Sequence, residues 1–206
     1  GAVGAAIFFV AVFVPPAGAG NPPEATVRLF GGEGIDSGVG VFSRTDGSLA
    51  VIASSSAFGD GDNVTCLLAV DLGGAMTSVV SFGGVGVELP GVARKSGDGG
   101  FIVVGIYNHP PEIEVFDIVL MKVSVNGELE WQRAYPSPGG SAPRDVCPTR
   151  DGGYVVLGDA YNVPEDGFIV DRIALMKTDA AGTPQWQRLY GQGSLNHGTD
   201  VVERCD

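Results

Sequence analysis

The sequence predicts an all-β protein built from four-stranded antiparallel sheets that repeat about every 53 residues. The first observation behind this prediction is a repeat: residues 98–105 recur as residues 151–158, and residues 120–122 recur as residues 175–177. The second is that glycine-rich turn signals separate short runs of β-branched and aromatic residues, a pattern typical of strands joined by hairpins. The third is that no segment keeps the hydrophobic period of a helix.

The clearest repeat covers residues 144–190, and each of its elements has a reason in the sequence. Asp-Gly-Gly at residues 151–153 predicts a tight hairpin turn, because glycine adopts the positive φ that such turns need. Asp-Ala-Ala-Gly at residues 179–182 predicts a second turn, and residues 162–167 predict a longer loop. The four predicted strands are residues 145–149, 154–157, 169–178 and 185–190.

The fourth strand predicts how the sheets pack. Trp186, Arg188 and Tyr190 share one of its faces, and residues 131–133 carry the same Trp-Gln-Arg pattern one repeat earlier. One four-stranded sheet cannot bury both faces, so we expect sheets to stack with these aromatic residues and the apolar second strand between them. Stacked sheets of this kind are the blades of a β-propeller, here a partial one. A β-sandwich or a parallel β-helix is the alternative, although β-helix rungs are much shorter than this repeat.

The repeat assigns fuller blades to residues 38–82, 91–135 and 144–190 and partial blades to residues 26–30 and 199–206. A propeller normally has about four to eight blades, so residues 20–206 are expected to be a propeller fragment. The last residue corresponds to the Asp that opens the Asp-Gly-Gly turn in earlier repeats. We therefore expect further blades or domains of the same full-length protein as partners.

The N-terminal segment, residues 1–19, carries no charge and contains an apolar run at residues 7–14. Residues 17–19 read Ala-Gly-Ala, the small-residue pattern that signal peptidases accept. We expect a signal peptide with a truncated n-region, a mature chain that starts near Gly20 and a secreted, extracellular or cell-surface location. The alternatives are a buried N-terminal strand or a shortened membrane anchor. No membrane span is expected in the mature chain, because a span needs about 20 apolar residues.

Charge and cysteine content exclude several classes of site. The formal net charge is −12, so nucleic acid is not an expected partner, and docking on anionic lipid is disfavoured. Cys66, Cys147 and Cys205 form no C-x-x-C pair of the kind found in zinc ribbons and thioredoxin-type sites. We expect small buried thiols, and at most one disulfide is compatible with three cysteines.

Three motifs follow one another in each clear repeat: D-G-G plus Tyr or Phe, then L-M-K, then W-Q-R closely followed by Tyr. This order of motifs resembles that of secreted bacterial and archaeal β-propeller repeat proteins. The resemblance covers about residues 26–206 and is clear in the second and third fuller blades. It is poor in the first, where Thr77 and Ser78 replace the Trp. Residues 179–186 are also similar to the tryptophan-docking pattern of quinoprotein-type propellers. These resemblances imply a blade architecture in exported, often multi-domain proteins, and they imply no catalytic residue.

Candidate binding residues lie in the longer loops, which differ between repeats and leave the same end of each blade. Variable loops on a rigid scaffold are where binding usually resides. The alternative is that these loops are merely solvated. The ligand-binding candidates are Tyr107, Asn108, His109, Tyr161, Asn162, Asn196 and His197. Oxygen-bearing side chains in one further loop indicate a calcium site, with an ordinary Gly-Asp turn as the alternative, and no other cofactor is expected. The calcium candidates are Asp60, Asp62 and Asn63.

The sequence contains neither a G-x-S-x-G nucleophile motif nor a phosphate-binding P-loop motif. We therefore expect an exported, non-enzymatic β-propeller that acts as a binding scaffold for a protein or a glycan. One alternative is a catalytic propeller, glycan-active or quinoprotein-like, whose active site needs blades outside this sequence. The other is a passive spacer within a long surface protein.

Overall fold

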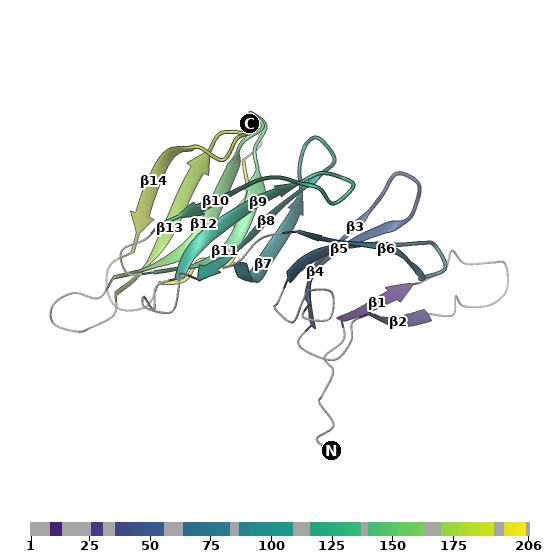
Figure 1. The fold of residues 1–206 in the computed structure, drawn as a ribbon. Coiled ribbons are helices and arrows are strands. Elements are labelled where there is room, and N and C mark those ends of the chain that lie inside the picture. Colours follow the sequence, from purple (N-terminus) through teal and green to yellow (C-terminus); the bar gives the residue numbers. More distant parts are fainter. Residues whose placement is uncertain are drawn as a thin grey trace, which may run out of the picture. The chain divides into compact units, whose positions relative to one another are not determined.

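The computed structural model describes residues 9–13, 26–30, 36–55, 64–82, 87–108, 116–136, 140–162, 170–191 and 196–204. Within these residues the regular elements are all β-strands, and most belong to three sheets of four antiparallel strands (Figure 1). The predicted all-β class and four-stranded antiparallel repeat are therefore confirmed. The described part of the chain contains no helix long and apolar enough to cross a membrane. The chain divides into two compact units, Gly1–Phe82 and Gly83–Asp206.

The first unit contains the first sheet and a two-stranded ribbon. The first sheet has the order β3 (Asp36–Ser43), β4 (Leu49–Ser55), β5 (Val64–Val70) and β6 (Met76–Phe82), so that consecutive strands are neighbours. The ribbon pairs β1 (Phe9–Phe13) with β2 (Thr26–Phe30). Part of the expected leader is thus a strand in this structure, and removal of a signal peptide stays a prediction. The core of this unit consists of Phe30, Val51, Ala53, Cys66, Leu68 and Val70.

The second unit contains two sheets with the same strand order. The second sheet comprises β7 (Val87–Lys95), β8 (Phe101–Asn108), β9 (Phe116–Val123) and β10 (Leu129–Tyr135). The third sheet comprises β11 (Ser141–Pro148), β12 (Tyr154–Asn162), β13 (Val170–Thr178) and β14 (Pro184–Tyr190). All four strands predicted for residues 144–190 exist. β12 runs past its predicted end at residue 157, because its backbone continues to pair with both β11 and β13.

The second and third sheets stack face to face, and the core of the second unit lies between them (Figure 1). The first strand of the third sheet, β11, packs against β7, β8 and β9. Apolar side chains of β8 and β9 meet those of β11, β12 and β13, and each fully buried aliphatic side chain stabilises the fold by roughly 1.5–3 kcal/mol. The core residues are Ile102, Val104, Ile118, Leu120, Val146, Tyr154, Val156 and Met176.

One end of β10 docks onto the turn between β13 and β14. The ring of Trp131 lies edge-on to Tyr154 with 6.0 Å between ring centroids. The side chains of Arg133 (Nε) and Tyr135 (Oη) donate hydrogen bonds, each 2.7 Å long, to the carbonyls of Ala181 and Gly182. A Cβ on Gly182 would lie 2.8 Å from the Trp131 ring, so glycine is required at this close approach. The prediction that Trp and Tyr of the fourth strand fill the space between sheets is confirmed for this strand.

The two most visible sequence motifs meet in an ion pair. Lys122 Nζ of the L-M-K motif lies 2.8 Å from Asp98 Oδ2 of the D-G-G motif, and Lys177 Nζ lies 2.8 Å from Asp151 Oδ2 in the next repeat. Hydrogen bonds from the Lys122 and Ser96 side chains lower the pKa of Asp98 to about 2. Both lysines are largely buried, so the motifs serve to close each hairpin rather than to form a site.

The outer face of the third sheet differs from that of the second. Trp186 and Tyr190 repeat Trp131 and Tyr135, yet they are 41 % and 47 % exposed, because no described segment of this unit covers them. Residues 199–204, the described part of the partial blade expected at residues 199–206, form no regular strand. They contact the third sheet through hydrogen bonds such as Val201 N to Asp145 Oδ2 at 3.1 Å.

Candidate functional site

A polar cluster lies at the end of the third sheet where β12 leaves the sheet and β13 enters it. Antiparallel pairing places the end of β12 beside the starts of β11 and β13, and Tyr161 pairs directly with Asp171. Residues 196 and 197, which follow β14, complete the arrangement. We call this the loop-end cluster, and it consists of Arg144, Asp159, Tyr161, Asp171, Asn196 and His197.

Asp159 is the buried centre of the loop-end cluster, with 0 % of its surface exposed. Its Oδ2 accepts a hydrogen bond from Arg144 Nε at 2.5 Å and lies 2.9 Å from His197 Nδ1. The hydrogen bond to Asp159 raises the pKa of Arg144, which keeps the guanidinium charged.

His197 lies between two carboxylates. Its Nε2 is 4.0 Å from Oδ2 of Asp171, and Asn196 holds the segment on β13 by donating to the Asp171 backbone carbonyl at 3.0 Å. The His197 side chain is 46 % exposed, whereas that of Asp171 is 8 % exposed. The buried carboxylates therefore orient an imidazole that reaches the solvent.

The loop-end cluster presents donors at the surface and acceptors beneath them. The Arg144 side chain is 39 % exposed, so part of its guanidinium is accessible beside the imidazole of His197. Oδ1 of Asp159 and Oδ1 of Asp171 are buried and have no hydrogen-bond partner among the described residues. A buried acceptor without a partner destabilises a protein by about 1–3 kcal/mol, so these two oxygen atoms lower the stability of the fold at this position.

The structure brings three of the predicted binding residues together. Tyr161, Asn196 and His197 all belong to the loop-end cluster, and Asn162 is the last residue of β12, next to Tyr161. Burial raises the pKa of Tyr161, so its hydroxyl remains a neutral hydrogen-bonding group. Sequence reasoning thus found the surface of the cluster.

Other predicted residues lie on the second sheet or outside the described residues. Tyr107 and Asn108 end β8, and the neighbouring strand start at Phe116 comes close to the third sheet at Gly140. A Cβ on Gly140 would lie 3.5 Å from the Phe116 carbonyl oxygen and 3.8 Å from the Tyr161 ring. His109 and the calcium candidates Asp60, Asp62 and Asn63 lie outside the described residues.

Sequence reasoning missed Arg144, which is partly exposed, and the two buried carboxylates of Asp159 and Asp171. A comparison of the repeats could have pointed to Asp159. At the corresponding position of the preceding repeat the residue is the apolar Ile106. A buried charged residue needs a partner, and the partners of Asp159 are Arg144 and His197.

The chemistry of the loop-end cluster favours hydrogen bonding to a polar ligand. Among the described residues no group of three or more His, Cys, Asp and Glu has the geometry to hold a metal ion. Arg144 already neutralises Asp159 through a close ion pair. The oriented imidazole of His197 can donate, accept or transfer a proton at its solvent side.

No protein-family model matches this chain, and no curated protein sequence matches it. The loop-end cluster and the repeat architecture are therefore the basis for a functional assignment.

Proposed function

We propose that this protein is an exported, non-enzymatic β-propeller-type scaffold that binds a glycan through the loop-end cluster. The observation that carries the proposal is the placement of a half-exposed imidazole and guanidinium on a rigid pair of stacked sheets. Asp159, fully buried beneath them, holds both groups in position. Positioned polar groups on a rigid scaffold lose little conformational entropy on binding.

The chemistry of the cluster supports a neutral glycan rather than an acidic ligand. A net charge of −12 repels anions at long range, which opposes recruitment of an acidic partner. Glycan hydroxyls both donate and accept hydrogen bonds, and the partly exposed side chains of Arg144 and His197 offer them polar partners at the surface. The partly exposed ring of Tyr161 adds an apolar surface of the kind that a sugar ring can cover.

The first experiment screens the 206-residue chain on an array of neutral and acidic glycans and measures affinity for a neutral hit by calorimetry. We expect His197→Ala to weaken binding at least about tenfold, because one oriented hydrogen bond is lost while Arg144 still pairs with Asp159. Arg150→Ala is the matched control, since Arg150 is exposed at the Asp-Gly-Gly turn at the opposite end of the third sheet. Unchanged melting temperatures would show that both variants are folded.

Equal affinity of the His197→Ala variant and the parent chain would overturn the role of the cluster. Binding to acidic glycans alone, or to a protein and no glycan, would overturn the ligand class. A passive spacer would give no ligand in any of these assays.

A catalytic propeller is the second candidate, and the Asp159–His197 pair is the observation that favours it. A carboxylate that orients an imidazole is a common general-base arrangement. A catalytic role predicts that the neutral glycan is cleaved on incubation with the chain. Release of sugar products that stops in the His197→Ala variant would select this candidate over simple binding.

A further inference from the structure

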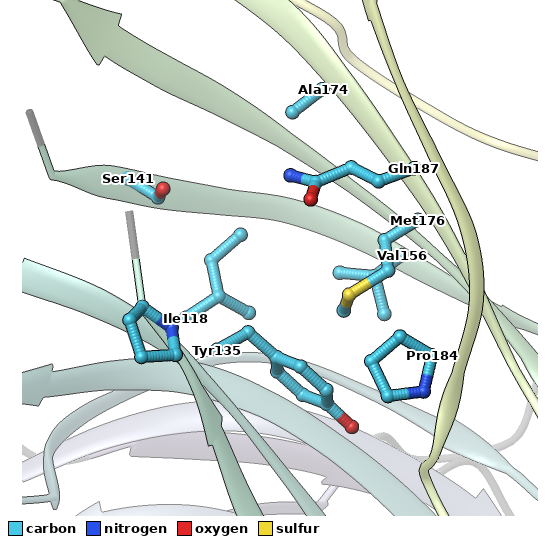
Figure 2. Close-up of a pocket in the computed structure, with 9 residues that line it drawn as sticks. Ile118, Tyr135, Ser141, Val156, Ala174, Met176, Pro184 and Gln187 are labelled. Carbon is cyan, nitrogen blue, oxygen red and sulfur yellow. The ribbon is translucent and has the colours of Figure 1, made fainter. Parts of the chain in front are cut away.

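A cavity of about 180 Å³ lies between the second and third sheets, and none of its lining residues belongs to the loop-end cluster. Figure 2 shows side chains of both sheets facing this space. Ile118 and the ring of Tyr135 come from the second sheet, while Val156, Ala174 and Met176 come from the third. Most of the wall is apolar, and this size is similar to that of cavities that hold one benzene ring.

The cavity communicates with the solvent. Ile118 and Met176 each keep 7 % exposure and Ala174 keeps 6 %, whereas Ile102, Val104 and Leu120 of the same core are 0 % exposed. The residual exposure therefore falls on residues that line the cavity. A small molecule could reach the space without separating the two sheets.

The walls of the cavity are held in place. The hydroxyl of Tyr135 donates to the carbonyl of Gly182 at 2.7 Å, which fixes its ring as one wall. Ser141, which is buried, and Gln187, which is exposed, place a hydroxyl and an amide at the same space (Figure 2). The site therefore combines an apolar body with two groups that can hydrogen-bond a single polar atom.

The repeat explains why there is room at this position. Ala174 occupies the place on the third strand of its sheet that Val119 occupies in the preceding repeat. Valine is larger than alanine by two methyl groups, and Val119 is completely buried. The small side chain of Ala174 thus leaves space that the repeat pattern fills elsewhere.

We propose that this cavity is a binding site for a small, flat, mostly apolar molecule with one hydroxyl or N–H group. An aromatic ring fits the volume and the wall of Tyr135, and its polar atom would hydrogen-bond Gln187 or Ser141. Its lining shares no residue with the loop-end cluster, so binding at the cavity and binding of a glycan are tested with different variants.

The test is a titration of the 206-residue chain with phenol, followed by NMR of the methyl groups. We expect the methyl signal of Met176 to shift with a Kd on the order of 1 mM, as befits a ligand of few atoms. Ala174→Val should reduce the affinity at least about tenfold, because it adds the side chain that the neighbouring repeat carries. Its melting temperature should be unchanged or raised, which shows that the variant folds.

A matched pair tests the polar contact. Gln187→Ala should weaken phenol binding about threefold to tenfold, whereas Gln132→Ala, at the corresponding position of the preceding repeat, should leave it unchanged. The proposal is overturned if phenol does not shift the methyl signal of Met176 in the parent chain. It is also overturned if the Ala174→Val variant binds phenol with the same affinity as the parent chain. The phenol titration does not depend on the glycan-binding measurement with the His197→Ala variant. Failure of this proposal is therefore distinguishable from failure of the proposed function.

Discussion

At the residue scale, the neighbouring strand explains why the third residue of the Asp-Gly-Gly motif is glycine, because the lysine of that strand lies against it. A Cβ on Gly153 would lie 2.1 Å from the carbonyl oxygen of Thr178 and 2.6 Å from Nζ of Lys177. In the first sheet, serine takes the place of this glycine at Ser48, and the position of the lysine is held by Ala69. The glycine and the buried lysine therefore occur together, because the first leaves room for the second.

This contact predicts a large effect of a single methyl group. Gly153→Ala should lower the free energy of unfolding of the second unit by about 2–4 kcal/mol, because backbone must shift to admit the Cβ. Gly97→Ala is the control, since no atom lies within 4 Å of its Cβ position. Urea denaturation followed by tryptophan fluorescence measures both values. Similar stabilities of the two variants would contradict this account of the motif.

At the element scale, one strand type has two different environments. β10 and β14 carry the same Trp, Arg and Tyr on one face, but only β10 meets the turn of a neighbouring sheet within the described unit. Trp131 packs against the core, and Trp186 is exposed. The same sequence motif thus stabilises the fold only where a partner turn is present.

Paired alanine substitutions test this difference. Trp131→Ala should destabilise the chain by about 2–4 kcal/mol, since it removes a large ring from between the two sheets. Trp186→Ala should change stability by less than about 1 kcal/mol, because its ring is exposed. The measurement is the melting temperature of each variant by circular dichroism. A loss for Trp186→Ala as large as that for Trp131→Ala would refute the docking explanation.

At the scale of the whole molecule, the chain consists of two compact units that meet in sequence after Phe82. The fourth strand of the first sheet has Ser78 and Phe82 at the positions of Trp131 and Tyr135. It therefore lacks the ring that docks on a neighbouring turn. Each unit has its own core. Cys66 belongs to the core of the first unit, and both tryptophans lie in the second unit.

These cores predict two separate unfolding transitions. Tryptophan fluorescence follows the second unit, and thiol labelling of Cys66 follows the first, once Cys147 and Cys205 are replaced by serine. Burial raises the pKa of the Cys66 thiol to about 12, so it should react only after its unit opens. We expect different urea midpoints for the two probes. Coincident midpoints would show a single cooperative unit.

Local sequence determined the secondary structure and the repeat. Asp-Gly-Gly at residues 151–153 and Asp-Ala-Ala-Gly at residues 179–182 specify turns by local backbone preference, and β-branched runs specify the strands between them. The sharing of one face by Trp131, Arg133 and Tyr135 likewise follows from strand alternation. These features depend on neighbours in sequence, so they could be predicted.

Only the tertiary structure decided which of these residues are buried and which form a site. Trp131 and Trp186 have the same local sequence, and the difference between them arises from the presence of a docked turn. Asp159 meets His197 across 38 residues of sequence, and Arg144 contacts both of them. Such contacts depend on how sheets stack and where loops return, and no local pattern encodes that geometry.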